Sequence, residues 1–262
     1  DKKIKILTLS DHPLTPSGVG TQTRYIIEAM LRTGKYEFIS FGGLVKHEDY
    51  RPVRTEEFGE DWTIVPTDGY GTQEQLRAAL WSEKPDILWF MTDPRFFGWL
   101  WQIEEEVRYN VPMMYYHVWD NQPYPTFNKA SYESNDFIAT ISKVTDDIVK
   151  TVAPNVKNQY VPHAVDANFF KPLEKEKIAI LRKDNFKENA GKLIFFWNNR
   201  NARRKMGASL IYWFKVFLDK IGADKAILLM HTDPRDKAGS NLEALTAELG
   251  LDAGQVIPHM IV

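Results

Sequence analysis

Short apolar segments alternate along the chain with segments of helical periodicity. Lys3–Leu9 alternates and then becomes apolar, which is typical of a strand entering the core of a sheet. After a polar loop, Ser10–Gly20, apolar residues recur at helical spacing from Tyr25 to Leu31. Phe38–Phe41 then predicts a second strand. The opening of the chain therefore predicts strand, loop, helix and strand.

The same alternation continues through the next hundred or so residues. Strands are predicted at Trp62–Val65, Asp86–Met91, Val111–His117, Asp136–Ile141 and Gln159–Val161, and helices at Gln73–Ser82, Phe96–Tyr109 and from an N-cap at Ser142 to Val152. Near-uniformly apolar strands separated by helices indicate a parallel sheet covered on both faces. With right-handed crossovers, such a sheet is a doubly wound, Rossmann-like α/β domain.

A polar, charge-dense stretch interrupts this pattern before it starts again. We expect an N-terminal domain at 1–170, a linker at 171–190 and the start of a second Rossmann-like domain at 191–262. In the second domain, strands are predicted at Lys192–Trp197, Ala226–Met230 and Gln255–Ile257, with helices at Leu210–Ile221 and Asn241–Leu249. Since a sheet holds about 5–6 strands on average, this domain is expected to be incomplete. The chain is then either a fragment or is completed by a partner chain. An unfinished sheet could also pair with a second copy, so a homo-oligomer is a further possibility.

Composition removes several classes of protein. Of the 262 residues, 44% are hydrophobic and 13% aromatic, which is globular and not disordered composition. No apolar run approaches the roughly 20 residues of a membrane helix. The absence of cysteine excludes a disulfide scaffold and a thiolate metal site, and is compatible with a cytoplasmic protein. A net charge of −2 argues against a nucleic-acid partner. No basic amphipathic helix indicates membrane association, although a peripheral location stays open.

A glycine-containing loop follows the first predicted strand. In Ser17–Thr21, Gly18 and Gly20 allow backbone amides to approach an anion at the start of the first helix. The segment is neither the dinucleotide fingerprint nor a P-loop, because the third glycine and the Gly-Lys-Ser/Thr sequence are both missing. An ordinary turn between a strand and a helix is the alternative interpretation.

Two other groups follow predicted strands. His117 ends a buried strand, where ligands of open α/β sheets bind, and its ring can donate a hydrogen bond to a phosphate or sugar hydroxyl. A structural histidine is the alternative. Four cations follow the first strand of the second domain, namely Arg200, Arg203, Arg204 and Lys205. They suit a polyanion, because arginine offers a fork to phosphate and lysine a point charge. A solvated basic turn or a nucleic-acid patch is the alternative.

Taken in order, these segments resemble glycosyltransferase family four, which has the GT-B fold. The family's hinge sequence, Val-Pro-Asn-Gly-Val-Asp followed by Phe-x-Pro, matches Val161–Asp166 and Phe170–Pro172, with His-Ala in place of Asn-Gly. The family's second domain opens with a strand ending in Gly-Arg and a lysine five residues later. Arg200 and Lys205 have this spacing, with asparagine in place of the glycine. The resemblance extends over essentially the whole chain.

The resemblance implies a retaining, metal-independent transfer of a sugar from a nucleotide-sugar donor to a carbohydrate or other hydroxyl acceptor. The donor acts as co-substrate, so no separate cofactor is expected. Arg200 and Lys205 would hold the diphosphate and neutralise the leaving group in the cleft between the domains. His117 would contact the transferred sugar or its phosphate. Gly18 and Gly20 would bring backbone amides near the donor phosphate and the acceptor.

One departure from the family concerns donor binding. The family's Glu-x7-Glu motif, which grips the donor sugar and ribose, would fall after Val262, and Glu243 and Glu248 have the wrong spacing for it. The chain alone is therefore expected to bind nucleotide-sugar poorly and to turn over little. Neither the donor sugar and base nor the acceptor can be named from the sequence.

Two other functions compete with the transferase. A GT-B-like sugar-nucleotide epimerase would need an acidic residue at a strand end, and the sequence offers Asp11, Asp93 and Asp120. A non-catalytic sugar- or nucleotide-binding module would use aromatic side chains as stacking platforms. Trp99, Trp101 and Trp119 are candidates, with core packing as the alternative.

Overall fold

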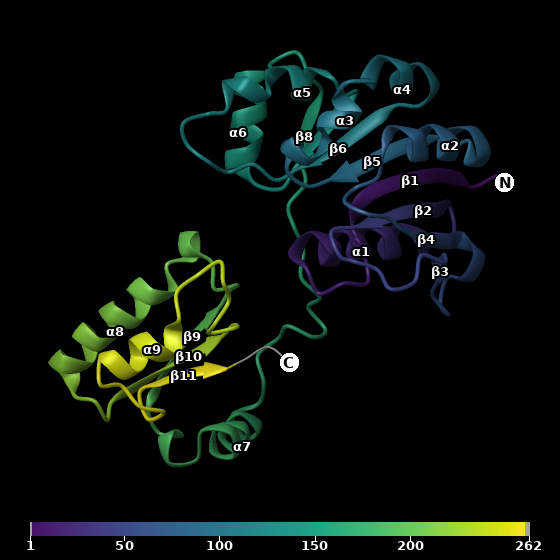
Figure 1. Ribbon diagram of the computed structural model, residues 1–262. Helices are drawn as coiled ribbons and strands as arrows, with labels where there is room; N and C mark the ends of the chain where they lie inside the picture. The colour runs from purple at the N-terminus through teal and green to yellow at the C-terminus, as the bar shows by residue number, and fades with distance from the viewer. Residues whose placement is uncertain (1, 260–262) are drawn as a thin grey trace. The chain divides into compact units, whose positions relative to one another are not determined.

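The computed structural model describes residues 2–259, and the chain divides into two compact units between Ala167 and Asn168 (Figure 1). The strands of the first unit are Ile4–Asp11 (β1), Tyr36–Gly43 (β2), Val53–Arg54 (β3), Trp62–Pro66 (β4), Ile87–Met91 (β5), Met113–His117 (β6), Phe137–Thr140 (β7) and Asn158–Tyr160 (β8). Its α-helices are Gly18–Leu31 (α1), Gln73–Glu83 (α2), Gly98–Trp101 (α3), Glu104–Asn110 (α4), Lys129–Glu133 (α5) and Lys143–Val152 (α6). Within the described residues, no helix is long and apolar enough to cross a bilayer.

The strands of the first unit form one sheet in the order β3-β4-β2-β1-β5-β6-β7-β8. All neighbouring pairs are parallel except β3 and β4, and the short strand β3 was not predicted. The chain adds β2 and β4 on one side of β1 and then returns to add β5 to β8 on the other. The predicted doubly wound, Rossmann-like domain is confirmed, and its order reverses between β1 and β5. Ligands of such sheets bind outside the carboxyl ends of the strands at this reversal.

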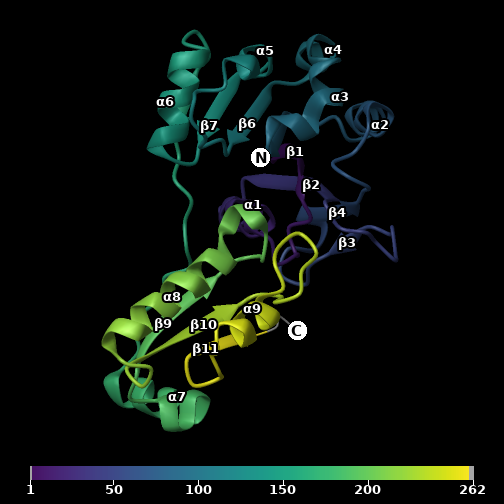
Figure 2. The same cartoon turned by 60° about the vertical axis from the view of Figure 1, so that its left-hand side comes forward.

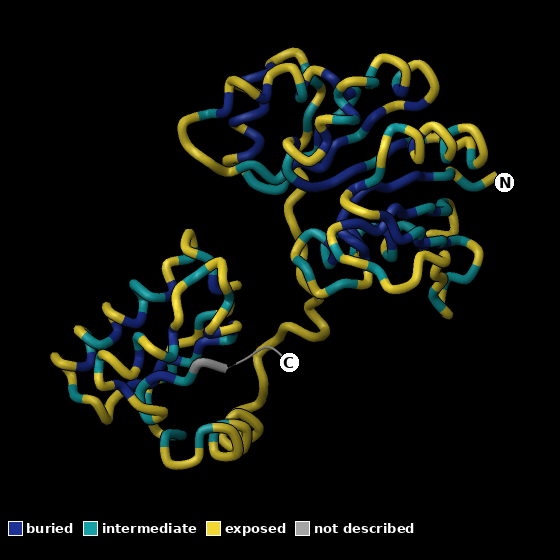
Figure 3. Tube along the Cα trace, in the orientation of Figure 1, coloured by how far each residue is buried: buried dark blue, intermediate teal, exposed yellow. Residues whose placement is uncertain are grey.

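Helices cover the sheet of the first unit on both faces. On one face, Ile27 of α1 packs in a cluster with Ile6 and Trp62. On the other, the helices α2, α4 and α6 pack over a larger cluster that includes Leu7 and Phe90 (Figure 2). Neighbouring residues of β1 thus enter opposite cores, because side chains alternate across a strand. Figure 3 shows the resulting burial of the central strands in dark blue.

The single helix predicted over Phe96–Tyr109 is wrong, because the chain forms a 3-10 turn followed by the separate helices α3 and α4. In a continuous α-helix, the amide of Ile103 would donate to the carbonyl of Trp99. The side-chain amide of Gln73 donates to that carbonyl instead, at 3.0 Å, and the Ile103 amide turns to Leu100 at 3.1 Å. The helical hydrogen bond is thus absent at the point where a side chain from a neighbouring helix contacts the Trp99 carbonyl.

The second unit contains a smaller parallel sheet in the order β11-β10-β9. Its elements are α7 (Lys175–Phe186), β9 (Leu193–Asn198), α8 (Gly207–Ile221), β10 (Ala226–His231), α9 (Leu242–Glu248) and β11 (Val256–His259). The helices α8 and α9 lie side by side against the sheet, where Ile211, Leu218 and Leu242 meet Met230 (Figures 1 and 2). From β9 to β11, the order of strands and helices follows the sequence prediction.

The segment at 171–190, predicted as a linker, contains the helix α7. None of its residues is buried, but the Arg182 guanidinium donates to the carbonyls of Ala190 at 2.9 Å and Lys192 at 2.6 Å. Glutamate, lysine, arginine and leucine all favour helix, so the charge density that suggested a linker equally suits an exposed helix.

Helix α6 offers a matched test of the first core. The Ile148 side chain is fully buried there, whereas Val144, one turn earlier, is 45% exposed. Ile148→Ala should lower the free energy of unfolding by about 2–5 kcal/mol through lost burial and a residual cavity. Val144→Ala should change it by less than about 0.5 kcal/mol. Urea denaturation followed by tryptophan fluorescence measures both, and equal effects would contradict the assignment of the buried face.

Candidate functional site

The buried carboxylate of Asp11 organises the carboxyl edge of the first sheet at the point where the strand order reverses. Asp11 ends β1 and is 3% exposed. Its two oxygens accept hydrogen bonds from the hydroxyls of Ser17, at 2.6 Å, and Tyr70, at 2.8 Å. Ser17 is the N-cap of α1, and its Oγ also accepts from the amide of Gly20 at 2.9 Å. The carboxylate therefore fixes the start of α1 to the end of β1.

The two glycines of this segment have different surroundings. Both lie in the first turn of α1, and not in a loop before it. A Cβ at Gly20 would lie 2.8 Å from the carbonyl oxygen of His12 and 2.9 Å from Ser17 Oγ, so this position has no room for a side chain. A Cβ at Gly18 would meet nothing within 4 Å. The Gly20 amide is occupied by Ser17, whereas the Gly18 amide has no partner within residues 2–259 and can meet an anion.

His117 lies at the end of β6 and is fully buried. Its Nε2 is 2.6 Å from the hydroxyl of Tyr132, and its Nδ1 has no hydrogen-bond partner in the described part of the chain. Burial lowers the pKa of His117 to about 3. The ring is therefore neutral near pH 7. Its unpartnered Nδ1 is buried and not open to a ligand in this structure, and its pKa does not suit proton exchange at that pH.

A second histidine at this edge was missed by the sequence analysis. His12 follows β1 directly, and its Nδ1 accepts from the amide of Leu14 at 3.2 Å, which leaves the proton of the neutral ring on Nε2. A Cβ on Gly42 would lie 2.5 Å from the ring, so that glycine makes room for it. Burial, and then the nearby His47, lowers the pKa of His12. The sequence could have indicated this residue, because His12 closely follows the first predicted strand, where ligands of such sheets bind.

The acidic residues considered for an epimerase differ in their surroundings. Asp11 accepts the hydrogen bonds from Ser17 and Tyr70 that are described above. Asp93 caps the turn after β5 and forms an ion pair with Arg95, whose guanidinium lies 5.4 Å from the ring centre of Trp119. Asp120 is exposed. The three tryptophans considered as stacking platforms are partly buried and pack against the larger core, which favours their packing role.

The carboxyl edge of the second sheet carries the predicted cationic group. Arg200 follows β9, and its guanidinium pairs with Asp236, with Nε to Oδ2 at 2.7 Å and Nη2 to Oδ1 at 3.3 Å. Lys205 ends a 3-10 turn and forms no ion pair within residues 2–259. Met206, the N-cap of α8, has a φ of 55° and makes no side-chain cap. The first amides of α8 thus lie beside Lys205 without a cap, which is a favourable place for an anion.

The loop that carries these cations is tied to the loop after β10. Asn201 is 2% exposed, and its Nδ2 donates to the carbonyl oxygens of Ser240 at 2.7 Å and Pro234 at 3.4 Å. The amide of Arg203 donates to the carbonyl of Ala238 at 3.1 Å. The two loops therefore form one connected surface at the end of β9 and β10.

The predicted site residues thus fall into two groups. Gly18, Gly20 and His117 lie at the carboxyl edge of the first sheet, and Arg200 and Lys205 lie at that of the second. Each group belongs to its own unit. Within residues 2–259, no cluster of three or more histidine, aspartate or glutamate side chains could hold a metal ion.

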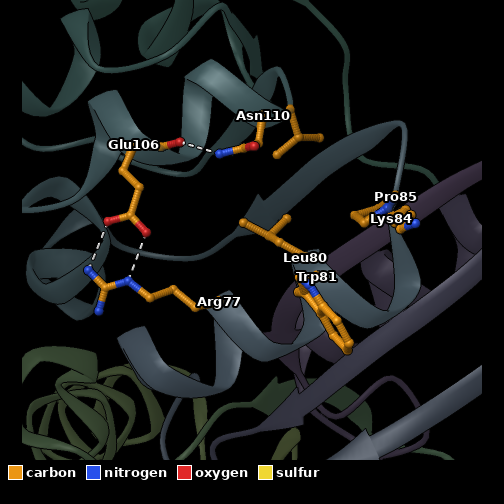
Figure 4. Close-up of a pocket in the computed structure, with 8 residues that line it drawn as sticks. Arg77, Leu80, Trp81, Lys84, Pro85, Glu106 and Asn110 are labelled. Atoms are coloured by element: carbon orange, nitrogen blue, oxygen red, sulfur yellow. Dashed lines mark hydrogen bonds and ion pairs between the residues drawn. The ribbon is translucent and has the colours of Figure 1, made fainter.

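A surface pocket of about 510 Å³ lies elsewhere, between α2 and α4 (Figure 4). Its walls include Trp81 and the paired side chains of Arg77 and Glu106. Pro85 and Val111, which precede β5 and β6, also line it, so the pocket belongs to the amino edge of the sheet. None of the predicted site residues lines this pocket.

The chain has the GT-B fold, which it shares with solved structures of glycosyltransferases. One, described as a glycosyltransferase from Rickettsia africae, is 16% identical with a TM-score of 0.67, covering 99% of this chain and 69% of that one. A second, from E. coli and bound with UDP-2-fluoro glucose, is 12% identical with a TM-score of 0.63, covering 98% and 73%. A UDP-forming trehalose-phosphate synthase from Burkholderia xenovorans is 13% identical with a TM-score of 0.64, covering 100% and 74%. No protein-family model and no curated protein matches the sequence.

The two glycines give a matched pair of substitutions. Gly20→Ala should cost about 1–3 kcal/mol of folding free energy, because the new Cβ forces the chain at His12 and Ser17 to move. Gly18→Ala should be nearly neutral, since its Cβ enters open space. Chemical denaturation of both variants measures the difference. A Gly20→Ala variant as stable as Gly18→Ala would disprove the close approach.

The pH dependence of stability tests the burial of His117. Because its pKa is about 3 in the folded chain and about 6.5 when unfolded, the unfolded chain alone takes up this proton between those values. The free energy of unfolding should fall by up to about 1.4 kcal/mol per pH unit below pH 6.5. His117→Gln should lack that part of the slope. Urea denaturation between pH 7.5 and 4.5 compares the two proteins, and parallel curves would rule out a neutral buried ring.

Proposed function

We propose that this chain is a glycosyltransferase that moves a sugar from a nucleotide-sugar donor to an acceptor hydroxyl. We further propose that it resembles family four in retaining the configuration of the sugar and in needing no metal. The observation that carries the proposal is the second unit's cationic edge, where Arg200 and Lys205 flank the uncapped start of α8. The fold that the chain shares with solved glycosyltransferases supports the same proposal.

In this proposal, the second unit binds the diphosphate of the donor. Arg200 can grip two phosphate oxygens with its planar fork, and Lys205 adds a compact positive charge. The first amides of α8 donate hydrogen bonds to the same group. Negative charge grows on the diphosphate as the bond to the sugar breaks, and these fixed donors stabilise it without a metal ion.

The first unit has hydrogen-bond donors of its own at the carboxyl edge of its sheet. The Gly18 amide is an exposed donor at the start of α1, whereas the unpartnered Nδ1 of His117 is buried and does not reach a ligand in this structure. The Nε2 of His12 adds a further donor at the end of β1. Among the similar structures, one is bound with UDP-2-fluoro glucose and another is in complex with glucose-6-phosphate. Uridine nucleotides and sugar phosphates are therefore the first ligands to test.

Ligand-dependent stability tests the diphosphate site. Pyrophosphate and a panel of nucleoside diphosphates and nucleotide-sugars are titrated against the protein while thermal unfolding is recorded. A ligand at 100 times its dissociation constant should add about 2.7 kcal/mol of stability. The double variant Arg200→Ala, Lys205→Ala should lose most of this gain, because it removes both cations from the site.

Lys220→Ala is the matched control, since Lys220 is an exposed cation at the opposite end of α8. This variant should respond to the ligands as the original protein does. If the gain in stability survives in the double variant, the diphosphate binds elsewhere. If no diphosphate stabilises the original protein at millimolar concentration, the donor site proposed for the second unit is wrong.

A further inference from the structure

Arg200 is held from one side by a carboxylate that sequence analysis did not select. Asp236 lies in the loop after β10, and its two oxygens meet Nε and Nη2 of the guanidinium at 2.7 and 3.3 Å. The Asp236 side chain is 16% exposed, whereas that of Arg200 is 71% exposed. The Asp236 carboxylate is thus packed against its loop, whereas the Arg200 side chain is largely exposed.

The geometry of this pair leaves part of the guanidinium free. An arginine has five N–H groups, and a side-on pair through Nε and Nη2 uses the edge nearest the chain. The other edge, formed by Nη1 and the second proton of Nη2, stays available for two oxygens of one anion. Asp236 can therefore orient the fork without occupying the edge that phosphate would use.

Asp236 is itself held by the backbone of the loop that carries it. The amide of Ala238 donates to its Oδ1 at 2.9 Å, and the Arg203 amide donates to the carbonyl of the same alanine at 3.1 Å. A Cβ at Gly239 would lie 2.2 Å from the carbonyl oxygen of Asn201, so the two loops approach too closely for a side chain there. Arg200, together with the Ala238 amide, lowers the pKa of Asp236, which keeps the acid charged at neutral pH.

We propose that Asp236 is a positioning residue for diphosphate binding, which holds the Arg200 fork toward the ligand from the loop after β10. The proposal rests on the proposed function, because it takes Arg200 as a diphosphate ligand. The proposal adds that the diphosphate site is built from the loops after β9 and β10. The loop after β10, which carries Asp236, does not itself contact the ligand. Without Asp236, Arg200 must lose side-chain rotamer freedom when the ligand binds, and affinity falls.

A double-mutant cycle tests this role with pyrophosphate and the best nucleoside diphosphate as ligands. Asp236→Asn keeps the oxygen that accepts from Ala238 but replaces the charged partner of Arg200. It should weaken binding by roughly 2- to 150-fold, which corresponds to the coupling energies of residues in contact. In an Arg200→Ala background the same change should have no further effect, because its target is gone. Calorimetry gives the affinities, and chemical denaturation checks that each variant folds.

Glu243→Gln is the matched control, because Glu243 forms the neighbouring pair with Arg235 at 2.6 Å and belongs to the same part of the unit. It should leave diphosphate affinity unchanged. An NMR measurement of the Arg200 Nε–H group adds a readout without ligand. The group should be ordered in the original protein and mobile in Asp236→Asn, with the fold intact in both.

Four results would overturn the positioning role of Asp236. Equal weakening by Asp236→Asn in both backgrounds would show that the acid acts without Arg200. Tighter binding would show that it competes with the ligand for the fork. A mobile Arg200 side chain in the original protein would show that nothing holds it. If the original protein binds no diphosphate, the proposed function itself fails. If Arg200→Ala weakens binding while Asp236→Asn does not, only the positioning role fails.

Discussion

Parallel pairing of β1 with both β2 and β5 is the constraint on which the first unit depends. Because these strands run in the same direction, every loop that follows one of them leaves the sheet at the same edge. The strands up to β4 are added on one side of β1, and those from β5 onward are added on the other. The connections of these two groups of strands therefore lead away from β1 in opposite directions along the sheet. Polar groups from distant parts of the sequence, including the buried Asp11 and His117, therefore lie at one edge of the sheet.

Each unit fixes its edge with a buried polar side chain. Asp11 joins the end of β1 to the start of α1 through Ser17, and Asn201 joins the loop after β9 to the loop after β10. Loops usually move more than the strands they connect. A buried group with satisfied hydrogen bonds makes movement costly, because separation would leave its polar atoms without partners. The two edges thus share one means of holding a backbone in place for a ligand.

The sequence predicted the strands well because each central strand is buried on both faces and therefore nearly uniformly apolar. It failed where a tertiary contact decided the outcome. The helix predicted after Phe96 is interrupted where the side chain of Gln73, far away in the sequence, donates to the carbonyl of Trp99. The helix α7 was missed because an exposed helix and a charged linker share the same composition. At the site, residue types and strand ends located Arg200 and His117, whereas Asp236 lies 36 positions from its partner and depends on the fold.

Groups at the two carboxyl edges have their charge states set before any ligand arrives. Burial keeps His117 neutral, so no charge develops at the end of β6 near pH 7. Asp236 raises the pKa of Arg200 and leaves it charged at all accessible pH values. Stabilisation of a leaving diphosphate is strongest when the donors need not reorient as charge develops. An arginine held by an acid, beside the uncapped start of α8, meets that requirement through the packing of two loops and not through the cations alone.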